Sequence, residues 1–280
     1  MRSGFVLPRG DARTAAELAA EAEAAGWDGF FVWEPVWGVD AWVALAAAAM
    51  TTSTIRLGTM LTPLPRRRPW DLAGQTATLD NLSGGRVILS VGLGAVHEGW
   101  TAFETDPGRR VRAELLDEGL AVLTGLWAGQ PFAYQGAHHT VRPTDFMLPA
   151  PPVQRPRIPV WVVGAWPYPR SMRRAARWDG WLPNFMPPGT GEATPDMLRE
   201  GAGWLREERA AQGHDMTGYE VIWEGRTPAG DPAAAAAVVA PWAEAGATWW
   251  LEADWSSADD PAAVTGASRQ RLRAGPPTAT

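Results

Sequence analysis

The chain has 280 residues, 31 acidic residues, 25 basic residues that are all arginine, no cysteine, and a formal net charge of −6. Without cysteine, the chain cannot form disulfides or thiolate metal sites, and it has no cysteine nucleophile. Without lysine, it cannot use Schiff-base catalysis or a Walker-type phosphate loop. The acidic balance disfavours nucleic acid as a partner.

The apolar segments are too short to enter a membrane. The N-terminal run 1–8 is shorter than the core of a signal peptide, and no segment reaches the roughly 18 uninterrupted apolar residues of a membrane span. The longest apolar stretch, 41–50, is rich in alanine and is predicted to be a buried helix. We therefore expect a cytoplasmic protein with no membrane partner, and the lack of cysteine suits that reducing compartment.

In chain order, short β-rich apolar runs alternate with amphipathic segments rich in alanine, leucine, arginine and glutamate, which is typical of βα units around a parallel sheet. Strands are predicted at 4–7, 29–33, 55–61, 87–92, 160–164, 180–183, 219–224 and 248–252. Helices are predicted at 14–25, 40–50, 70–82, 109–126, 169–177, 194–212, 231–245 and 261–274. The pattern predicts an α/β fold, a (β/α)8 TIM barrel, as one domain over residues 1–280.

One connection is longer than the others. About 70 residues separate the fourth and fifth predicted strands, and they hold a helix followed by a proline-rich segment. We interpret residues 130–158 as an insertion that passes over the barrel mouth, because no flexible linker or charge run divides the chain. An open doubly wound sheet is the alternative fold, but no Gly-x-Gly-x-x-Gly follows the first strand, where that fold carries its phosphate loop.

The ends of the predicted strands are the places to look for function, because a barrel gathers its chemistry where strands end and βα loops begin. Tryptophan and glycine recur there: Trp33, Trp37, Trp166, Trp223 and Trp255, and Gly58, Gly92, Gly94 and Gly164. Aromatic walls beside bare backbone suit a large planar cofactor better than a small polar substrate. The alternative is that many of these tryptophans only fill the core.

Several segments follow one another in a recognisable order. They are TIRLGTMLTP at 54–63, RRP at 67–69, ATLDNLSGGR at 77–86, LDEGL at 116–120, LWAGQP at 126–131, PVWVVG at 159–164 and DGW at 179–181. With them the chain resembles the luciferase-like monooxygenases and their deazaflavin-dependent relatives, over about two thirds of its length. The Leu-Ser-Gly-Gly-Arg stretch and its preceding helix are the specific part, and the rest corroborates it.

The resemblance implies that reduced FMN or the deazaflavin coenzyme F420 lies across the C-terminal face of the barrel. A bulge on the third strand, with a non-prolyl cis peptide bond expected at Thr59–Met60, would support the ring, and Thr62 would face its edge. The cofactor phosphate would meet backbone amides near the start of the fifth-unit helix. The residues expected to bind the cofactor are Trp33, Thr59, Met60, Thr62, Gly92, Gly94, Gly164, Ala165 and Arg170.

The expected acid/base residues follow from one departure from the family pattern. Several deazaflavin-dependent dehydrogenases carry Asp-His after the second strand, whereas this chain has Glu34 followed by a proline, which cannot transfer a proton. The remaining candidates are Glu34, His97 and Glu98. The four histidines of the chain show no metal-ligand spacing, so we expect no metal.

Arg66, Arg67 and Arg68 could attract an anionic cofactor tail, or they could pair with nearby carboxylates. The leading hypothesis for function is an oxidoreductase or monooxygenase that uses reduced FMN or a deazaflavin on a small organic substrate. One alternative is a barrel that binds flavin without turnover. A flavin-free, phosphate-handling barrel is a third hypothesis, which the lack of lysine disfavours. The resemblance also implies a homodimer, because relatives pair through helices of the second and third units.

Overall fold

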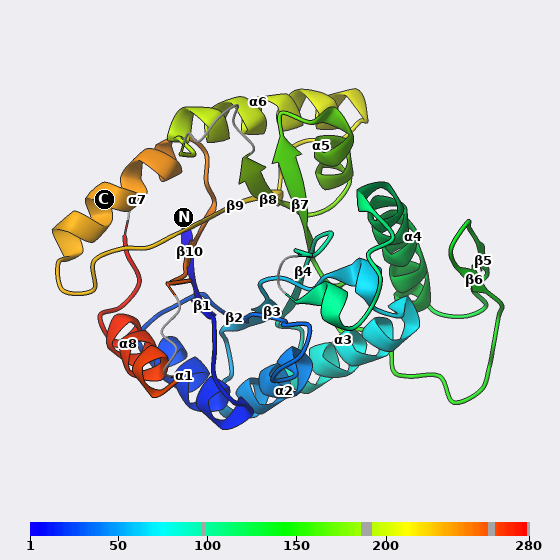
Figure 1. The fold of residues 1–280 in the computed structure, drawn as a ribbon, viewed down its shortest axis with the longest axis horizontal. Coiled ribbons are helices and arrows are strands. Elements are labelled where there is room, and N and C mark those ends of the chain that lie inside the picture. Colours follow the sequence, from blue (N-terminus) through cyan, green and yellow to red (C-terminus); the bar gives the residue numbers. More distant parts are fainter. Residues whose placement is uncertain (97–98, 186–191, 257–260, 279–280) are drawn as a thin grey trace.

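Eight parallel strands close into a barrel that is surrounded by helices (Figure 1). The computed structural model describes residues 1–96, 99–185, 192–256 and 261–278. The barrel strands are β1 (Arg2–Leu7), β2 (Gly29–Val32), β3 (Arg56–Thr59), β4 (Val87–Val91), β7 (Val160–Trp166), β8 (Gly180–Phe185), β9 (Glu220–Gly225) and β10 (Trp249–Glu252). All eight correspond to predicted strands, so the predicted (β/α)8 barrel is confirmed.

The helices that follow the strands lie on the outside of the barrel (Figure 1). They are α1 (Ala12–Ala24), α2 (Ala41–Thr51), α3 (Pro69–Ser83), α4 (Arg109–Ala128), α5 (Pro169–Ala176), α6 (Pro195–Ala211), α7 (Pro232–Glu244) and α8 (Pro261–Arg273). Short 3-10 turns, η1 (Leu64–Arg66) and η2 (Trp100–Ala102), lie in the loops after β3 and β4. No described helix has the length and apolarity needed to cross a bilayer.

Several helices start at a short polar side chain that satisfies free backbone amides, which fixes where the strand-end loop stops and the helix begins. Asp11 accepts from the amide of Thr14 at 2.7 Å, and Asp40 accepts from the amides of Trp42 and Val43 at 2.9 Å. Asp231 caps α7 in the same way. These caps limit the loops after β1 and β2 to a few residues at the rim of the barrel.

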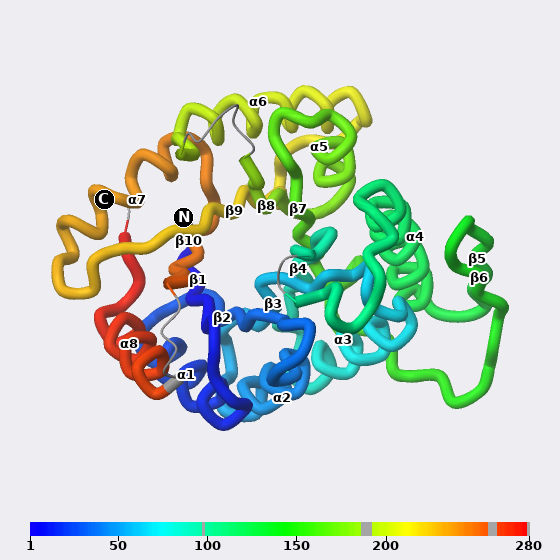
Figure 2. The backbone as a smooth tube through the Cα atoms, viewed as in Figure 1, coloured from blue at the N-terminus to red at the C-terminus, as the bar shows by residue number. Residues whose placement is uncertain are grey.

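The insertion before β7 does not pass over the mouth, so that expectation was wrong. It contains a small hairpin, β5 (Tyr134–Gln135) and β6 (Thr140–Val141), which lies outside α4 (Figures 1 and 2). Further on, Gln154 donates to Asp80 at the end of α3 and to the carbonyl of Val87 at the start of β4. The physical reason is topological: a segment that joins a helix to the next strand starts and ends at the N-terminal side of the barrel, opposite the mouth.

Aromatic side chains fill the inside of the barrel. Phe31 stacks on Trp161 with ring centroids 5.5 Å apart, and Trp161 meets Trp249 edge to face at 5.2 Å. All three side chains are buried. Their bulk requires bare backbone beside them: a Cβ on Gly58 would lie 2.9 Å from the Phe31 ring and 2.5 Å from the carbonyl oxygen of Ile88. Gly58 therefore makes room for core packing, not for a ligand.

Candidate active site

A cavity of about 950 Å³ opens at the C-terminal ends of the barrel strands. Every barrel strand, or the loop that follows it, contributes to its wall: Pro8, Trp33, Met60, Gly92, Ala165, Asn184, Glu224 and Asp254. Met60, Leu61 and Val163 line the cavity and also pack against the interior aromatic cluster, so they form its floor. A cavity of this size, built from all eight units, is where a barrel places its ligand.

The bulge on the third strand exists, but it lies one residue later than expected. The amide of Met60 still donates to the carbonyl of Val32 in β2 at 2.8 Å. The amide of Thr62 donates to the carbonyl of Ser90 in β4 at 2.9 Å. Leu61 therefore falls between two ladder hydrogen bonds, and the non-prolyl cis bond is Met60–Leu61, not Thr59–Met60. The ladder with β2 continues through Met60, and this places the bulge after it.

The expected threonines do not reach the cavity wall. Thr59 and Thr62 are fully buried, and their hydroxyls are hydrogen-bonded to each other at 2.9 Å. The residues exposed to the cavity are instead Met60 and Leu61. The expectation that Thr62 faces a ring edge was therefore wrong, because the bulge turns Thr62 back toward the neighbouring strand.

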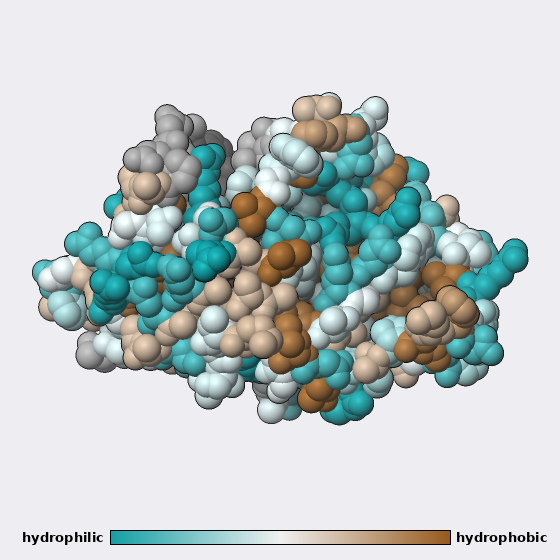
Figure 3. All heavy atoms as spheres, turned by 90° about the horizontal axis from the view of Figure 1, so that it is seen from below, coloured by the Kyte–Doolittle hydropathy of each residue, from teal (hydrophilic) through white to brown (hydrophobic). Residues whose placement is uncertain are grey.

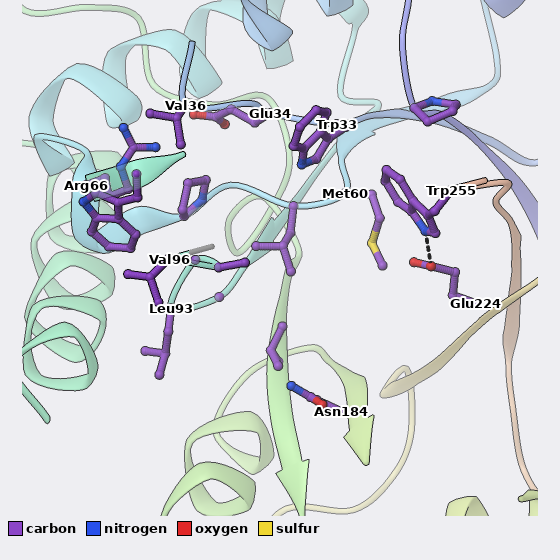
Figure 4. A pocket seen from close by; sticks show the side chains of 18 of the residues that line it. Trp33, Glu34, Val36, Met60, Arg66, Leu93, Val96, Asn184, Glu224 and Trp255 are labelled. Carbon is purple, nitrogen blue, oxygen red and sulfur yellow. Dashed lines mark hydrogen bonds between the residues drawn. The ribbon is translucent and has the colours of Figure 1, made fainter. Parts of the chain in front are cut away.

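Glu34 lies at the edge of the cavity, where Figure 4 shows its side chain, and it is the centre of a buried polar network. Its Oε2 accepts from the hydroxyl of Thr62 at 2.6 Å and from the indole of Trp42 at 3.2 Å, and its Oε1 pairs with Arg67 at 3.0 Å. Burial raises the pKa of Glu34 above its ordinary range, against the lowering effects of Arg67, Thr62 and Trp42. This carboxylate ties the loop after β2 to the segment after β3.

The end of the fourth strand lines the cavity with two glycines and with the side chains of Leu93, Ala95 and Val96. The two glycines are Gly92 and Gly94. Gly94 has φ +79°, and a Cβ there would lie 2.8 Å from Trp100 and 2.9 Å from Pro63. Trp100 also lines the cavity, and the sequence analysis missed it because it lies in η2, beyond the strand end. His97 and Glu98 lie outside the described residues, so their roles stay predictions.

The fifth unit contributes different residues from those expected. Gly164 is buried, and a Cβ there would lie 2.6 Å from the ring of Trp181, whose indole donates to the Gly164 carbonyl. Ala165 lines the cavity, and its amide donates to the hydroxyl of Ser171 at 2.9 Å. Gly164 thus serves core packing, because its missing side chain faces the surrounding helices.

Arg170 is exposed and is not part of the cavity wall, whereas Arg174 is. Arg174 lies one helical turn further along α5, where it makes a bidentate pair with Asp117, both distances 2.8 Å. On α4, Arg112 contributes to the wall and bonds the carbonyl of Gly94 at 2.8 Å. Sequence reasoning missed both arginines, since only the placement of the helices shows which helical positions meet the cavity.

The arginine cluster on one side of the cavity comprises Arg66, Arg109, Arg112 and Arg174, from the loop after β3, α4 and α5. Arg66 and Arg112 also hold the ring of Trp100, at 5.0 and 5.3 Å from its centroid. Arg66 pairs with Glu104 at 2.7 Å, and Arg67 pairs with Glu34, so the interpretation that these two arginines pair with local carboxylates is confirmed. Arg112 also pairs with Asp106 at 3.0 Å, and Arg174 pairs with Asp117, so carboxylates balance part of the charge of this wall. Its guanidinium groups still offer hydrogen-bond donors that suit an anionic ligand.

Two of the five strand-end tryptophans line the cavity, Trp33 and Trp255, with ring centroids 6.4 Å apart. Trp223 instead stacks on Trp242 of α7 at 3.7 Å, outside the barrel. Its neighbour Glu224 lines the cavity and accepts a hydrogen bond from the indole of Trp255 (Figure 4). The alternation of a strand puts Trp223 and Glu224 on opposite faces, and that signal could have identified Glu224.

Burial raises the pKa of Glu224 above its ordinary range, against the lowering effect of the Trp255 hydrogen bond. A carboxyl group in this condition can hold a proton at a pH where an exposed carboxyl would have lost it.

Among the residues that the structure describes, no group of three histidine, aspartate or glutamate side chains could hold a metal ion.

Comparison with known proteins gives a consistent result. The family profile described as luciferase-like monooxygenase matches residues 2–275. A Mycobacterium tuberculosis protein, provisionally named a coenzyme F420-dependent oxidoreductase, is 36% identical over 199 residues, which cover 66% of this chain and 55% of that protein. An F420-dependent hydroxymycolic acid dehydrogenase of the same organism is 33% identical over 193 residues, 64% of this chain and 51% of that protein. The chain thus spans about half the length of the curated relatives it matches.

Solved structures share the fold over nearly the whole chain. The monooxygenase RslO1 from Streptomyces bottropensis superposes with a TM-score of 0.80 at 20% identity and covers 98% of both chains. The coenzyme F420-dependent tetrahydromethanopterin reductase from Methanopyrus kandleri gives 0.74 at 18% identity, with 96% of this chain and 97% of that chain covered. At these identities the likeness concerns the fold.

Proposed function

Since this chain belongs to the luciferase-like monooxygenase family, we propose that it is an oxidoreductase that uses reduced FMN or the deazaflavin coenzyme F420 on a small organic substrate. The observation that carries the proposal is the cavity of about 950 Å³ at the barrel mouth, with its floor at Met60 and Leu61 and its arginine cluster on one side. A tricyclic ring with a phosphate-bearing tail needs both an apolar floor and a cationic wall.

The donors around the cavity fit such a cofactor. Arg109, Arg112 and Arg174 bring guanidinium donors to the wall, although Arg112 and Arg174 also pair with Asp106 and Asp117, and Ser171 adds a hydroxyl beside them. Trp100 Nε1 is a buried donor without a hydrogen-bond partner in the described part of the chain. An acceptor oxygen on a bound ligand would satisfy it. Gly92 lets the end of β4 pack closely on the floor, because a Cβ there would lie 3.1 Å from Leu61 and from Val163.

When bound, a reduced flavin or deazaflavin supplies the hydride or activates oxygen, and the chain supplies orientation, exclusion of water and protons. We assign Glu34 a positioning role, because both of its carboxylate oxygens are engaged by Thr62, Trp42 and Arg67. We assign Glu224 to proton transfer, since it lines the cavity and its raised pKa favours the protonated form. His97 and Glu98 remain further candidates for proton transfer.

Between the two cofactors, we take the deazaflavin as the first choice, because two sequence relatives are named for dependence on coenzyme F420. FMN is the second choice. The test is anaerobic titration of the purified protein with each cofactor, oxidised and reduced, followed by absorbance. We expect the reduced form of one of the two cofactors to bind saturably. Binding of neither contradicts the proposal, whereas binding without hydride transfer or oxygen uptake supports the non-catalytic flavin-binding barrel.

We also propose that the protein acts in the cytoplasm as a homodimer joined through α2 and α3. These helices carry exposed apolar side chains, Val43 and Met50 on α2 and Trp70 and Leu82 on α3. Figure 3, which views the molecule from below Figure 1, shows apolar residues scattered among hydrophilic ones on this side. Light scattering after size exclusion tests the dimer: Met50→Asp should yield monomers, and an unchanged mass would contradict this interface.

A further inference from the structure

A second hollow of about 750 Å³ adjoins the mouth cavity and plays no part in the function proposed above. It lies at the barrel rim between the N-terminal ends of α1, α2 and α8. Its inner surface is made of small and apolar side chains that are buried in the fold: Leu7, Ala15, Val32, Ala41 and Ala44. The hollow is therefore built on rigid strand and helix positions.

The two hollows are adjacent and share part of their walls. Pro8, Arg9, Trp33 and Val36 line both of them, so one layer of side chains separates the second hollow from the mouth cavity. Figure 4 shows Trp33 and Val36 on either side of Glu34 at the edge of the mouth cavity. A molecule that lies past Trp33 and Val36 would occupy both spaces at once.

The chemistry of the second hollow differs from that of the mouth cavity. The charged residues in its described wall are Arg9 and Asp11, and Asp11 is already engaged as the cap of α1. The arginine cluster lies on the side of the mouth formed by the loop after β3, α4 and α5, and none of its members lines the second hollow. This hollow suits an apolar, uncharged group.

Two aromatic side chains stand at the entrance and are exposed to water. Trp37 is 83% exposed and Phe103 is 61% exposed, and their ring centroids are 6.3 Å apart. They come from different loops, after β2 and after β4, and both line the second hollow. Large exposed apolar side chains that meet over a hollow mark a binding site more often than an isolated one does.

We propose that the second hollow binds the apolar portion, an alkyl chain or apolar ring, of an uncharged substrate whose reacting end lies in the mouth cavity. The wall that the two hollows share at Trp33 and Val36 supports this occupant, because it places an apolar space next to the cavity that has Met60 on its floor. The location of the reacting end rests on the proposed function. The apolar binding itself does not require the cofactor.

The test uses cofactor-free protein and straight-chain alcohols from butanol to decanol, which displace the neutral fluorescent probe Nile red. We expect affinity to rise about three- to fourfold with each added methylene until the hollow is filled. Trp37→Ser should weaken decanol binding about tenfold and leave the affinity for the phosphate-bearing cofactor unchanged. Phe146→Ser is the matched control and should change neither, because Phe146 is 78% exposed in the insertion before β7 and lies outside both hollows and outside the proposed dimer interface.

Three results overturn this inference. The first is alcohol affinity that does not depend on chain length, and the second is an equal loss of alcohol affinity in Trp37→Ser and Phe146→Ser. The third is conversion of a dimer into monomers by Trp37→Ser without a change in probe binding, which would assign this surface to a second copy of the chain. If length-dependent binding persists while no flavin or deazaflavin binds, the proposed function alone fails.

Discussion

The hydroxyl of Thr62 donates to the carboxylate of Glu34 over 2.6 Å, and both side chains are buried. This bond joins the segment that follows β3 to the loop that follows β2, so it fixes the bulge that carries Met60 and Leu61 on the cavity floor. Thr62→Val should lower the free energy of unfolding by about 1–3 kcal/mol, because it leaves a buried carboxylate with one partner fewer. Chemical denaturation of the variant and the wild type measures this difference in the free energy of unfolding.

Thr62→Ser is the control for that variant, since it keeps the hydroxyl and loses only a methyl group. It should retain most of the stability that the valine variant loses. Equal losses in the two variants would show that packing of the threonine methyl, and not the bond to Glu34, stabilises the bulge.

The raised pKa of Glu34 gives stability a definite pH dependence. Burial holds the folded-state pKa above the ordinary value of 4.5, so the folded chain binds this proton more tightly than the unfolded chain does. Stability that depends on Glu34 should therefore decrease as pH rises from 4.5 through the folded-state pKa. Glu34→Gln removes this titration, and its unfolding free energy should lack that decrease. The measurement is denaturation at a series of pH values, and parallel profiles would contradict the shift.

Glu23 should show the opposite sign. Burial alone would raise its pKa, but hydrogen bonds from the backbone amides of Ile55, Thr54 and Ser53 lower it to about 2. The stabilisation is therefore complete above pH 4.5 and is lost as pH falls from 4.5 through about 2. Glu23→Gln should be less stable at neutral pH and should approach wild type in acid, as followed by acid titration of the circular dichroism signal. A constant difference between the two proteins would sink this prediction.

The arginine cluster predicts a difference between two adjacent residues. Arg109 lines the cavity, whereas Arg110 is 88% exposed at its side chain and pairs with Glu114 on the outer face of α4. Arg109→Ala should weaken binding of the phosphate-bearing cofactor about tenfold, since one charge-assisted contact is lost. Arg110→Ala, with the same change of charge, should leave the dissociation constant within about twofold. Titration calorimetry measures the cofactor dissociation constants of both variants. Equal losses of affinity would mean that the net charge of the protein, and not the position of Arg109, governs cofactor binding.

Two glycines should respond in opposite ways to alanine. In β3, a Cβ on Gly58 would lie 2.5 Å from the backbone oxygen of Ile88, so Gly58→Ala should destabilise the barrel by about 2 kcal/mol or more. In α3, a Cβ on Gly74 meets nothing within 4 Å, so Gly74→Ala should stabilise by up to about 1 kcal/mol. Thermal unfolding of both variants checks the pair. A stable Gly58→Ala protein would refute the packing of Phe31 described above.

The positions of the eight strands were accessible from sequence because a buried parallel strand is a local run of apolar residues, and a helix follows each run here. The family segments likewise fixed the neighbourhood of the bulge to within one residue. Trp33, Met60, Gly92, Gly94 and Ala165 were predicted near a cofactor, and the structure places all five on the cavity wall, although their roles stay predictions.

The sequence by itself thus determined the architecture and the edge of the barrel where the site lies. Only the tertiary structure decided which side chains face that site. Gly164 and Trp223 point outward, while Glu224, one position from Trp223, points inward, because neighbouring strand residues face opposite sides and register is set by pairing across the closed barrel. Arg174, and not Arg170, belongs to the wall, because the position of α5 against the barrel decides which of its turns meets the cavity, and that position depends on contacts far apart in the sequence.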